Sequence, residues 1–205
     1  MGLLSWLVRR RGPGGFIAGC GIEKWWLDGI TEADRRRVRA KKEDIDQGKP
    51  NTGSIGADAK AALANLATWF MKNEERHIGR GLMALAETRS ASRRLSVIDR
   101  HFMLGDMIKF YYRCRNDGPE YLPLVEQCCR EMIVLAPRAA KALLDEDRRN
   151  YKAWGLKKTP ELLAGHEGYH RLMFLLKKRG DLAEAAKLEA QMLKQGWGGT
   201  GHEEA

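Results

Sequence analysis

The 205-residue sequence is poor in proline and in the β-branched residues that favour sheets. It contains only six prolines, and β-branched residues are sparse beside Ala, Leu, Lys, Arg and Glu. This balance favours helices over a sheet. Hydrophobic residues make up 43% of the chain, which is enough for a sizeable core. The composition therefore predicts an all-α protein.

Paired cysteine motifs and long apolar runs are also missing. The four cysteines, Cys20, Cys114, Cys128 and Cys129, include no CxxC pair, which argues against cysteine-ligated zinc or a disulfide framework. The adjacent Cys128 and Cys129 lie in an apolar helical stretch, where thiols pack as small hydrophobes. No apolar run approaches the roughly 20 residues that span a bilayer. A reducing, cytoplasmic location is predicted.

Two N-terminal patterns could suggest membrane attachment. Ile17 to Cys20 matches the cleavage box of a bacterial lipoprotein signal, but residues 12–15 (Gly, Pro, Gly, Gly) interrupt the apolar stretch such a signal needs. Gly2 fails the myristoylation pattern because Trp6 stands where Ser or Thr is required. Residues 1–11 have an apolar half and an arginine end, compatible with a short helix lying on an anionic membrane surface.

Positive charge is concentrated near the N-terminus. Residues 1–42 hold ten Lys and Arg against four Asp and Glu, so they carry +6 of the net +9. Such a cluster can attract nucleic acid, anionic lipid or an acidic protein, and the alternative is a solvated helix face. The residues that would bind nucleic acid are Arg9, Arg10, Arg11, Arg35, Arg36, Arg37, Arg39, Lys41 and Lys42.

The chain divides by composition into four segments. Residues 1–46 form a basic helical region, in which Thr31 is the expected N-cap of a helix that runs to about Asp46. Residues 47–56, rich in Gly, Pro, Asn, Thr and Ser, are predicted to be a linker. Residues 57–197 form the helical domain, and the Gly-rich residues 198–205 are predicted to be a flexible tail.

Within residues 57–197 the apolar spacing predicts about three helical hairpins. The first lies near residues 57–88 with a turn at Lys72 and Asn73, and the second near residues 98–137 with a turn at 116–119 and a closing Pro137. The third covers residues 168–193, and residues 138–163 leave room for a degenerate unit.

The third hairpin resembles a tetratricopeptide repeat (TPR). Gly180 permits a tight inter-helix turn, Asp181 caps the following helix, and Ala185 lets two backbones approach closely. The matching positions are Tyr169, Leu172, Leu176, Gly180, Asp181, Leu182 and Ala185. Met173, Glu189 and Trp197 depart from the pattern, which puts stacking onto a following repeat in doubt.

Residues 99–197 are also similar to a widespread type of bacterial helical protein, and this resemblance implies a fold but no activity. The elements that carry it are Phe110, Tyr111 and Tyr112; residues 133–137; His166, Gly168 and Tyr169; and Gln195, Gly196 and Trp197.

One motif suggests a metal. His166, Glu167 and His170 form a literal HExxH, in which two histidines share a helix face and can bind zinc while the Glu polarises the bound water. Glu189 could supply a third ligand. Gly168 weakens the helix, His166 stands at its expected start, and no strand pattern for a substrate-aligning sheet is present. A surface or capping role for both histidines is therefore favoured, and zinc is kept as the alternative cofactor.

The favoured function is a protein-interaction module, because helical hairpin repeats stack into a curved surface that receives a peptide or protein. Its candidate contact residues are Asn65, Trp69, Lys109, Tyr112, His170 and Arg171. Core packing is the alternative role of each aromatic, most of all of Trp69. A nucleic-acid-binding protein using the basic N-terminal helix is the alternative function, and a zinc-dependent hydrolase is the second.

Overall fold

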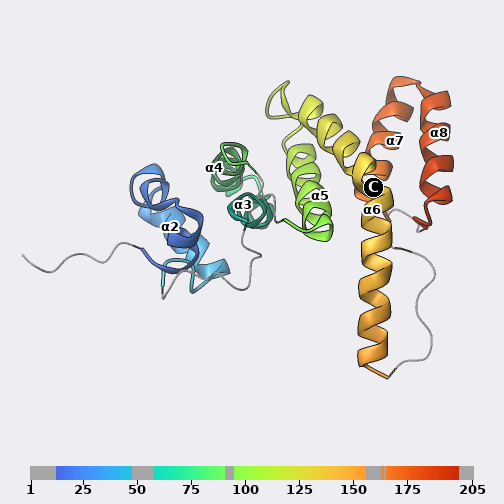
Figure 1. Cartoon of the computed structure of the whole chain (residues 1–205). Coiled ribbons are helices and arrows are strands. Elements are labelled where there is room, and N and C mark those ends of the chain that lie inside the picture. The colour runs from blue at the N-terminus through green and yellow to red at the C-terminus, as the bar shows by residue number, and fades with distance from the viewer. Residues whose placement is uncertain (1–12, 48–57, 91–94, 156–162, 164, 199–205) are drawn as a thin grey trace, which may run out of the picture. The chain divides into compact units, whose positions relative to one another are not determined.

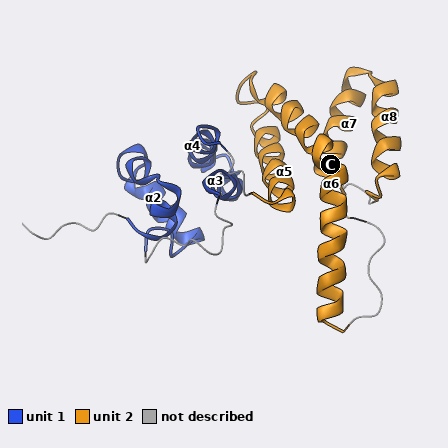
Figure 2. Ribbon diagram, in the orientation of Figure 1, with its two compact units in different colours: residues 1–93 blue, residues 94–205 orange. Residues whose placement is uncertain are grey.

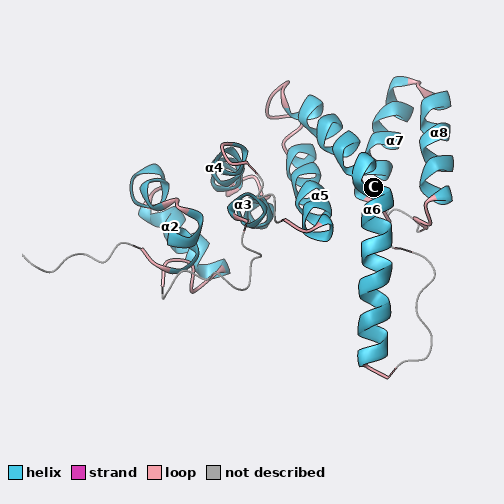
Figure 3. Ribbon diagram, viewed as in Figure 1, coloured by secondary structure: helices cyan, strands magenta, loops and turns pink. Residues whose placement is uncertain are grey.

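The protein is helical throughout the part that the structure, a computed structural model, describes: residues 13–47, 58–90, 95–155, 163 and 165–198. Among these residues no strand is present, and the single β-bridge joins Leu163 to Trp197 (Figures 1 and 3). The predicted all-α class is confirmed. None of the described helices combines the length and the apolar character needed to cross a bilayer.

The chain forms two compact units, residues 1–93 and residues 94–205 (Figure 2). This division differs from the predicted one, because the first hairpin belongs with the basic N-terminal region and not with the later helices. Several contacts join the segments on either side of the predicted linker, of which residues 48–56 lie outside the described part. Among them are Asp34 Oδ1 to His77 Nε2 at 3.0 Å, Lys41 Nζ to Glu75 Oε2 at 2.5 Å, and Arg89 Nη2 to the Cys20 carbonyl at 2.5 Å.

The first unit is built from short helices. Thr31 caps α2 as predicted, since its Oγ1 accepts the Asp34 N–H at 3.1 Å, but this helix ends at Lys41 and not near Asp46. Trp26 and Phe70 are among its largest fully buried side chains. The elements are α1 (Gly15–Cys20), a π-helical turn (Trp25–Gly29), α2 (Glu32–Lys41), α3 (Ala59–Ala67), a 3-10 turn (Thr68–Phe70) and α4 (Arg76–Glu87).

The second unit contains four longer helices: α5 (Val97–Arg113), α6 (Tyr121–Ala153), α7 (Glu167–Arg179) and α8 (Leu182–Lys194). Consecutive helices pack on one another, and α5 also contacts α7, so that the two helices share the buried face of α6. That face carries Val125, Cys129, Met132, Ala136, Ala139 and Ala140. All four cysteines of the chain are buried and free, as expected of thiols that pack as hydrophobes.

Pro137 does not close the second hairpin. It lies inside α6, which continues to Ala153, so the predicted degenerate unit over 138–163 begins as a continuation of this helix. Proline removes one backbone donor and disfavours a helix interior. The helix nevertheless continues through it, and the nearby Ala136 and Ala139 are both fully buried.

The turn of the third hairpin lies where the sequence predicts it. Gly180 has φ of +87°, in the left-handed region that favours glycine, and its N–H bonds back to α7. Asp181 occupies the N-cap position of α8, but its side chain forms no capping bond, contrary to expectation. Past the hairpin, Trp197 is buried, with only 2% of its surface exposed. Of the predicted tail, residues 199–205 lie outside the described residues.

The close approach of α7 to α6 at Gly168 gives a testable prediction. A Cβ at this position would meet the Cys129 carbonyl oxygen, the Met132 Cβ and the His166 ring, each at 3.1 Å, whereas a Cβ at Gly105 in α5 would meet only Met132 Cε at 3.7 Å. We expect Gly168→Ala to lower the free energy of unfolding by about 1–2 kcal/mol through overpacking.

The matched control is Gly105→Ala, which should raise the same free energy by up to about 1 kcal/mol through helix propensity. Urea denaturation of the full chain, followed by far-ultraviolet circular dichroism, measures both. Equal effects of the two substitutions would contradict the packing at Gly168.

Candidate functional site

An aromatic side chain of the second unit lies beneath two arginines. The guanidinium carbon of Arg171, on α7, is 3.8 Å from the centre of the Tyr112 ring, and that of Arg115 is 4.3 Å from it. Tyr112 is the penultimate residue of α5, and α5 contacts α7, which carries Arg171. Stacking on a ring orients a guanidinium while leaving its N–H groups available for carboxylates.

Phe174 and Lys178 extend this cluster along α7. The Phe174 ring meets Tyr112 edge to face at 6.1 Å and is 40% exposed, and Lys178 Nζ lies 4.8 Å over the Phe174 ring. The spacing of Glu167, Arg171, Phe174 and Lys178 places all four on one side of the helix. We call Tyr112, Arg115, Arg171, Phe174 and Lys178 the tyrosine–arginine cluster.

The charges of this cluster are only partly neutralised. Arg171 donates from Nη2 and Nε to Glu167 Oε1 at 3.0 and 3.3 Å. Arg115 donates to the Tyr112 carbonyl, and no described carboxylate pairs with Arg115 or with Lys178. The surface therefore offers two cations without anions beside a half-exposed aromatic ring, a combination that suits an acidic ligand with an apolar side chain.

The predicted contact residues are distributed over both units. Tyr112 and Arg171 come together in the cluster; Lys109 is exposed one turn earlier on α5, and His170 is half-buried beside Arg171. Asn65 and Trp69 lie in the first unit, where Trp69 is 43% exposed, contrary to the core packing favoured for it. Sequence reasoning missed Arg115, Phe174 and Lys178, although the period of α7 links the last two to Arg171.

The basic residues of α2 are mostly engaged within the first unit. Arg39 Nη2 donates to Asp46 Oδ2 at 2.6 Å, and its guanidinium lies 5.3 Å over the Trp26 ring. The other pairs are Arg35 with Glu32, Arg37 with Asp34, Lys41 with Glu75 and Lys42 with Asp44. Arg36 is exposed and forms no ion pair with the described residues. Arg9, Arg10 and Arg11 lie outside the described part.

Asp34 is the buried centre of this network. Burial by itself opposes its ionisation, but hydrogen bonds from Thr31, His77 and Arg37 outweigh that cost and lower the pKa of its carboxyl group. The positive charges of α2 thus serve largely to balance internal carboxylates, which leaves fewer of them available for phosphates.

The residues of the HExxH motif form the N-terminus of α7. His166 is the N-cap of α7, and its Nδ1 accepts the Tyr169 N–H at 3.2 Å, so it lies outside the helical turn that would align it with His170. Glu167 pairs with Arg171, and Glu189 is exposed on α8. No group of three His, Cys, Asp or Glu residues in the described part is arranged to hold a metal ion.

His166 belongs instead to a buried ring cluster with His101 and Trp197. The His101 ring stacks on Trp197 at 5.3 Å, and His166 meets His101 at 5.0 Å and Trp197 at 4.7 Å edge to face. All three residues are at most 5% exposed. Because they come from the start of α5, the start of α7 and the segment after α8, the cluster ties these three ends together.

Comparison with known proteins adds no family to this description: no protein-family model, curated protein or solved structure matches the chain.

The buried ring cluster predicts acid sensitivity. Burial lowers the pKa of His101 to about 4; burial and then the neighbouring His101 lower that of His166 to about 3. The unfolded chain, with histidine pKa values near 6.5, binds more protons than the folded one below that pH. The free energy of unfolding should therefore fall as pH drops from about 6.5 to about 4, by roughly 3 kcal/mol per histidine.

Urea denaturation across this pH range measures the slope. His101→Phe, which retains a ring against Trp197, should reduce the slope because it removes the titrating imidazole. A slope that His101→Phe leaves unchanged would contradict a neutral, buried His101.

The ion pairs formed by the basic residues of α2 give a second prediction. Arg39→Ala should lower the free energy of unfolding by about 1–2 kcal/mol, because it removes the Asp46 bond and the stacking on Trp26. Arg36→Ala, at the exposed and unpaired neighbour, should change it by no more than about 0.5 kcal/mol. Thermal and urea unfolding compare the two variants. Equal decreases in the free energy of unfolding would show that the contact of Arg39 with Asp46 does not stabilise α2.

Proposed function

We propose that the chain is a protein-interaction module whose second unit binds an acidic peptide or protein segment at the tyrosine–arginine cluster. The observation that carries the proposal is the position of Tyr112 beneath Arg171 and Arg115, beside the half-exposed Phe174 and the unpaired Lys178. Aromatic and arginine side chains are the residue types that most often dominate protein-binding surfaces.

The helix order supports the same function. In our proposal α5–α6 and α7–α8 are two TPR-like hairpins, with the first helix of each hairpin contributing to the binding surface. In such repeats the first helices stand side by side along one face. The contact of α5 with α7, and the burial of Tyr169, Leu172, Leu176 and Ala185 at the repeat's apolar positions, agree with this arrangement.

The cluster also defines the chemistry of the ligand. Carboxylates of the ligand would pair with Arg115 and Lys178, while an apolar or aromatic side chain would cover the exposed edge of Phe174. Arg171 is already held by Glu167 and Tyr112, so its side chain loses little conformational freedom on binding. Exposed ion pairs contribute modestly and weaken with salt, so the apolar contact must supply much of the affinity.

Selection of random peptides displayed on phage against the full chain tests the proposal. We expect enriched peptides to combine Asp or Glu with an adjacent apolar residue, and their binding to weaken as salt increases. The double variant Arg115→Glu/Lys178→Glu should bind them at least about tenfold more weakly, because it replaces both unpaired cations by anions.

The matched control is Lys187→Glu, which reverses an exposed charge on α8 away from the cluster. It should bind the selected peptides as the wild type does. Enrichment of basic peptides, or equal losses in the double variant and the control, would contradict a ligand site at the tyrosine–arginine cluster.

A further inference from the structure

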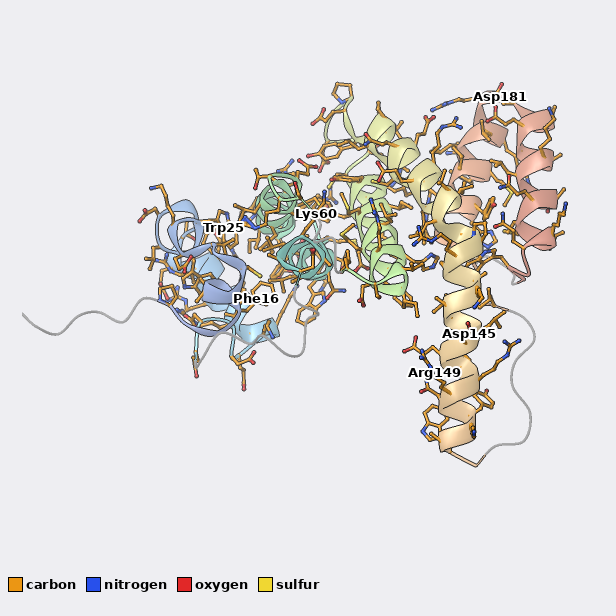
Figure 4. The ribbon with its side chains drawn as sticks, viewed as in Figure 1. Phe16, Trp25, Lys60, Asp145, Arg149 and Asp181 are labelled. Atoms are coloured by element: carbon orange, nitrogen blue, oxygen red, sulfur yellow. The ribbon has the colours of Figure 1, made fainter. Side chains whose placement is uncertain are left out.

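Three buried rings of the second unit carry polar atoms without partners. None of His101 Nδ1, His166 Nε2 and Trp197 Nε1 has a hydrogen-bond partner among the described residues. The rings contact one another, and each residue is at most 5% exposed. Asp181, labelled in Figure 4, marks the turn from α7 to α8, and the rings lie at the opposite end of this hairpin. Buried polar atoms are nearly always hydrogen-bonded, so three unpartnered ones in contact indicate a further partner.

The tautomer of His166 follows from its role as a helix cap. The Tyr169 N–H donates to His166 Nδ1 at 3.2 Å, and a backbone N–H can only donate, so Nδ1 carries no proton in the neutral ring. The proton therefore lies on Nε2, which is a donor. Burial lowers the pKa of His166 to about 3, so the ring is neutral at neutral pH. This tautomer disfavours a metal ion at Nε2, because the metal would have to displace that proton.

Two of the three atoms need an acceptor. Trp197 Nε1 is a donor like His166 Nε2, because the indole nitrogen always carries its hydrogen. Burial dominates the lowering of the His166 pKa; the Met132 backbone opposes it only weakly, and no hydrogen bond joins Met132 to Nε2. His101 is also neutral, since burial lowers its pKa to about 4, and its Nδ1 accepts a hydrogen bond in the tautomer protonated on Nε2. The rings thus offer two donors and one acceptor.

Size and charge narrow the choice of partner. Two hydrogen bonds of about 2.9 Å that meet at a tetrahedral oxygen hold their nitrogens about 4.7 Å apart. The ring centres are 4.7, 5.0 and 5.3 Å from one another, which suits a partner no larger than one oxygen atom. A buried anion would have no cation among these neutral rings to balance it. Water is neutral, both accepts and donates, and typically makes about three hydrogen bonds when buried.

We propose that one water molecule is bound between His101, His166 and Trp197 as a constant part of the second unit. The water accepts from His166 Nε2 and Trp197 Nε1 and donates to His101 Nδ1, so that all three polar atoms are partnered. It thereby joins the start of α5, the start of α7 and the segment after α8 by hydrogen bonds as well as by ring packing.

Nuclear magnetic resonance of the isotope-labelled full chain at neutral pH tests the site. Long-range proton–nitrogen correlation should show the His166 proton on Nε2 and none on Nδ1. Rotating-frame Overhauser spectra should show cross-peaks from water to Trp197 Hε1 and His166 Hε2, with the sign of a bound water and not the opposite sign of proton exchange. Trp154 is the matched control, since it is 68% exposed and its indole should show no cross-peak from a long-lived water.

Trp197→Phe tests the three-bond geometry. The variant keeps a ring against His101 but removes one donor, so the water cross-peak to His166 Hε2 should fall at least about twofold while circular dichroism shows the chain folded. An undiminished cross-peak in a folded variant would overturn the role of Trp197. In the wild type, a His166 proton on Nδ1, a scalar coupling across a direct bond from His166 Nε2 to His101 Nδ1, or the absence of both water cross-peaks would overturn the site.

Discussion

The organisation of the second unit depends on one helix face that two other helices share. From Val125 to Ala140, α6 presents a continuous row of buried residues to α5 and α7. This shared packing sets the distance between α5 and α7, and therefore places Arg171 over the Tyr112 ring. It also accounts for Gly168, because α7 begins where the α6 backbone is close enough to exclude a side chain. Beyond Ala140 no residue of α6 is buried, so this part of the helix is at least partly exposed.

Charge is used differently in the two units. In the first, cations of α2 meet carboxylates of the same unit, and the one cation of residues 35–42 without an ion pair is Arg36 among the described residues. In the second, Arg115 and Lys178 lie beside aromatic rings without a described carboxylate. The dense run of Lys and Arg in residues 35–42 thus leaves few unpaired charges among the described residues, whereas Arg115 and Lys178 in the second unit leave charge for a ligand.

Two kinds of ring cluster hold opposite ends of the second unit. The tyrosine–arginine cluster is half-exposed and carries fixed positive charge, which suits recognition. The cluster of His101, His166 and Trp197 is buried and holds its histidines neutral, which suits packing. The His166 side chain both caps α7 and packs against the rings of His101 and Trp197. These two roles account for the histidine at the first position of the HExxH motif.

The local features of the fold follow from the sequence, since helix periodicity, caps and turns depend on neighbouring residues. Thr31 as a cap, the left-handed Gly180 and the apolar spacing of α7 could all be predicted in this way. Tertiary packing decided the rest: that Pro137 continues a helix, that the first hairpin joins the basic region, and that Trp69 is exposed. It also decided which arginines meet a carboxylate and which a ring. These outcomes depend on residues distant in the chain, and neither composition nor spacing specifies which of them come into contact.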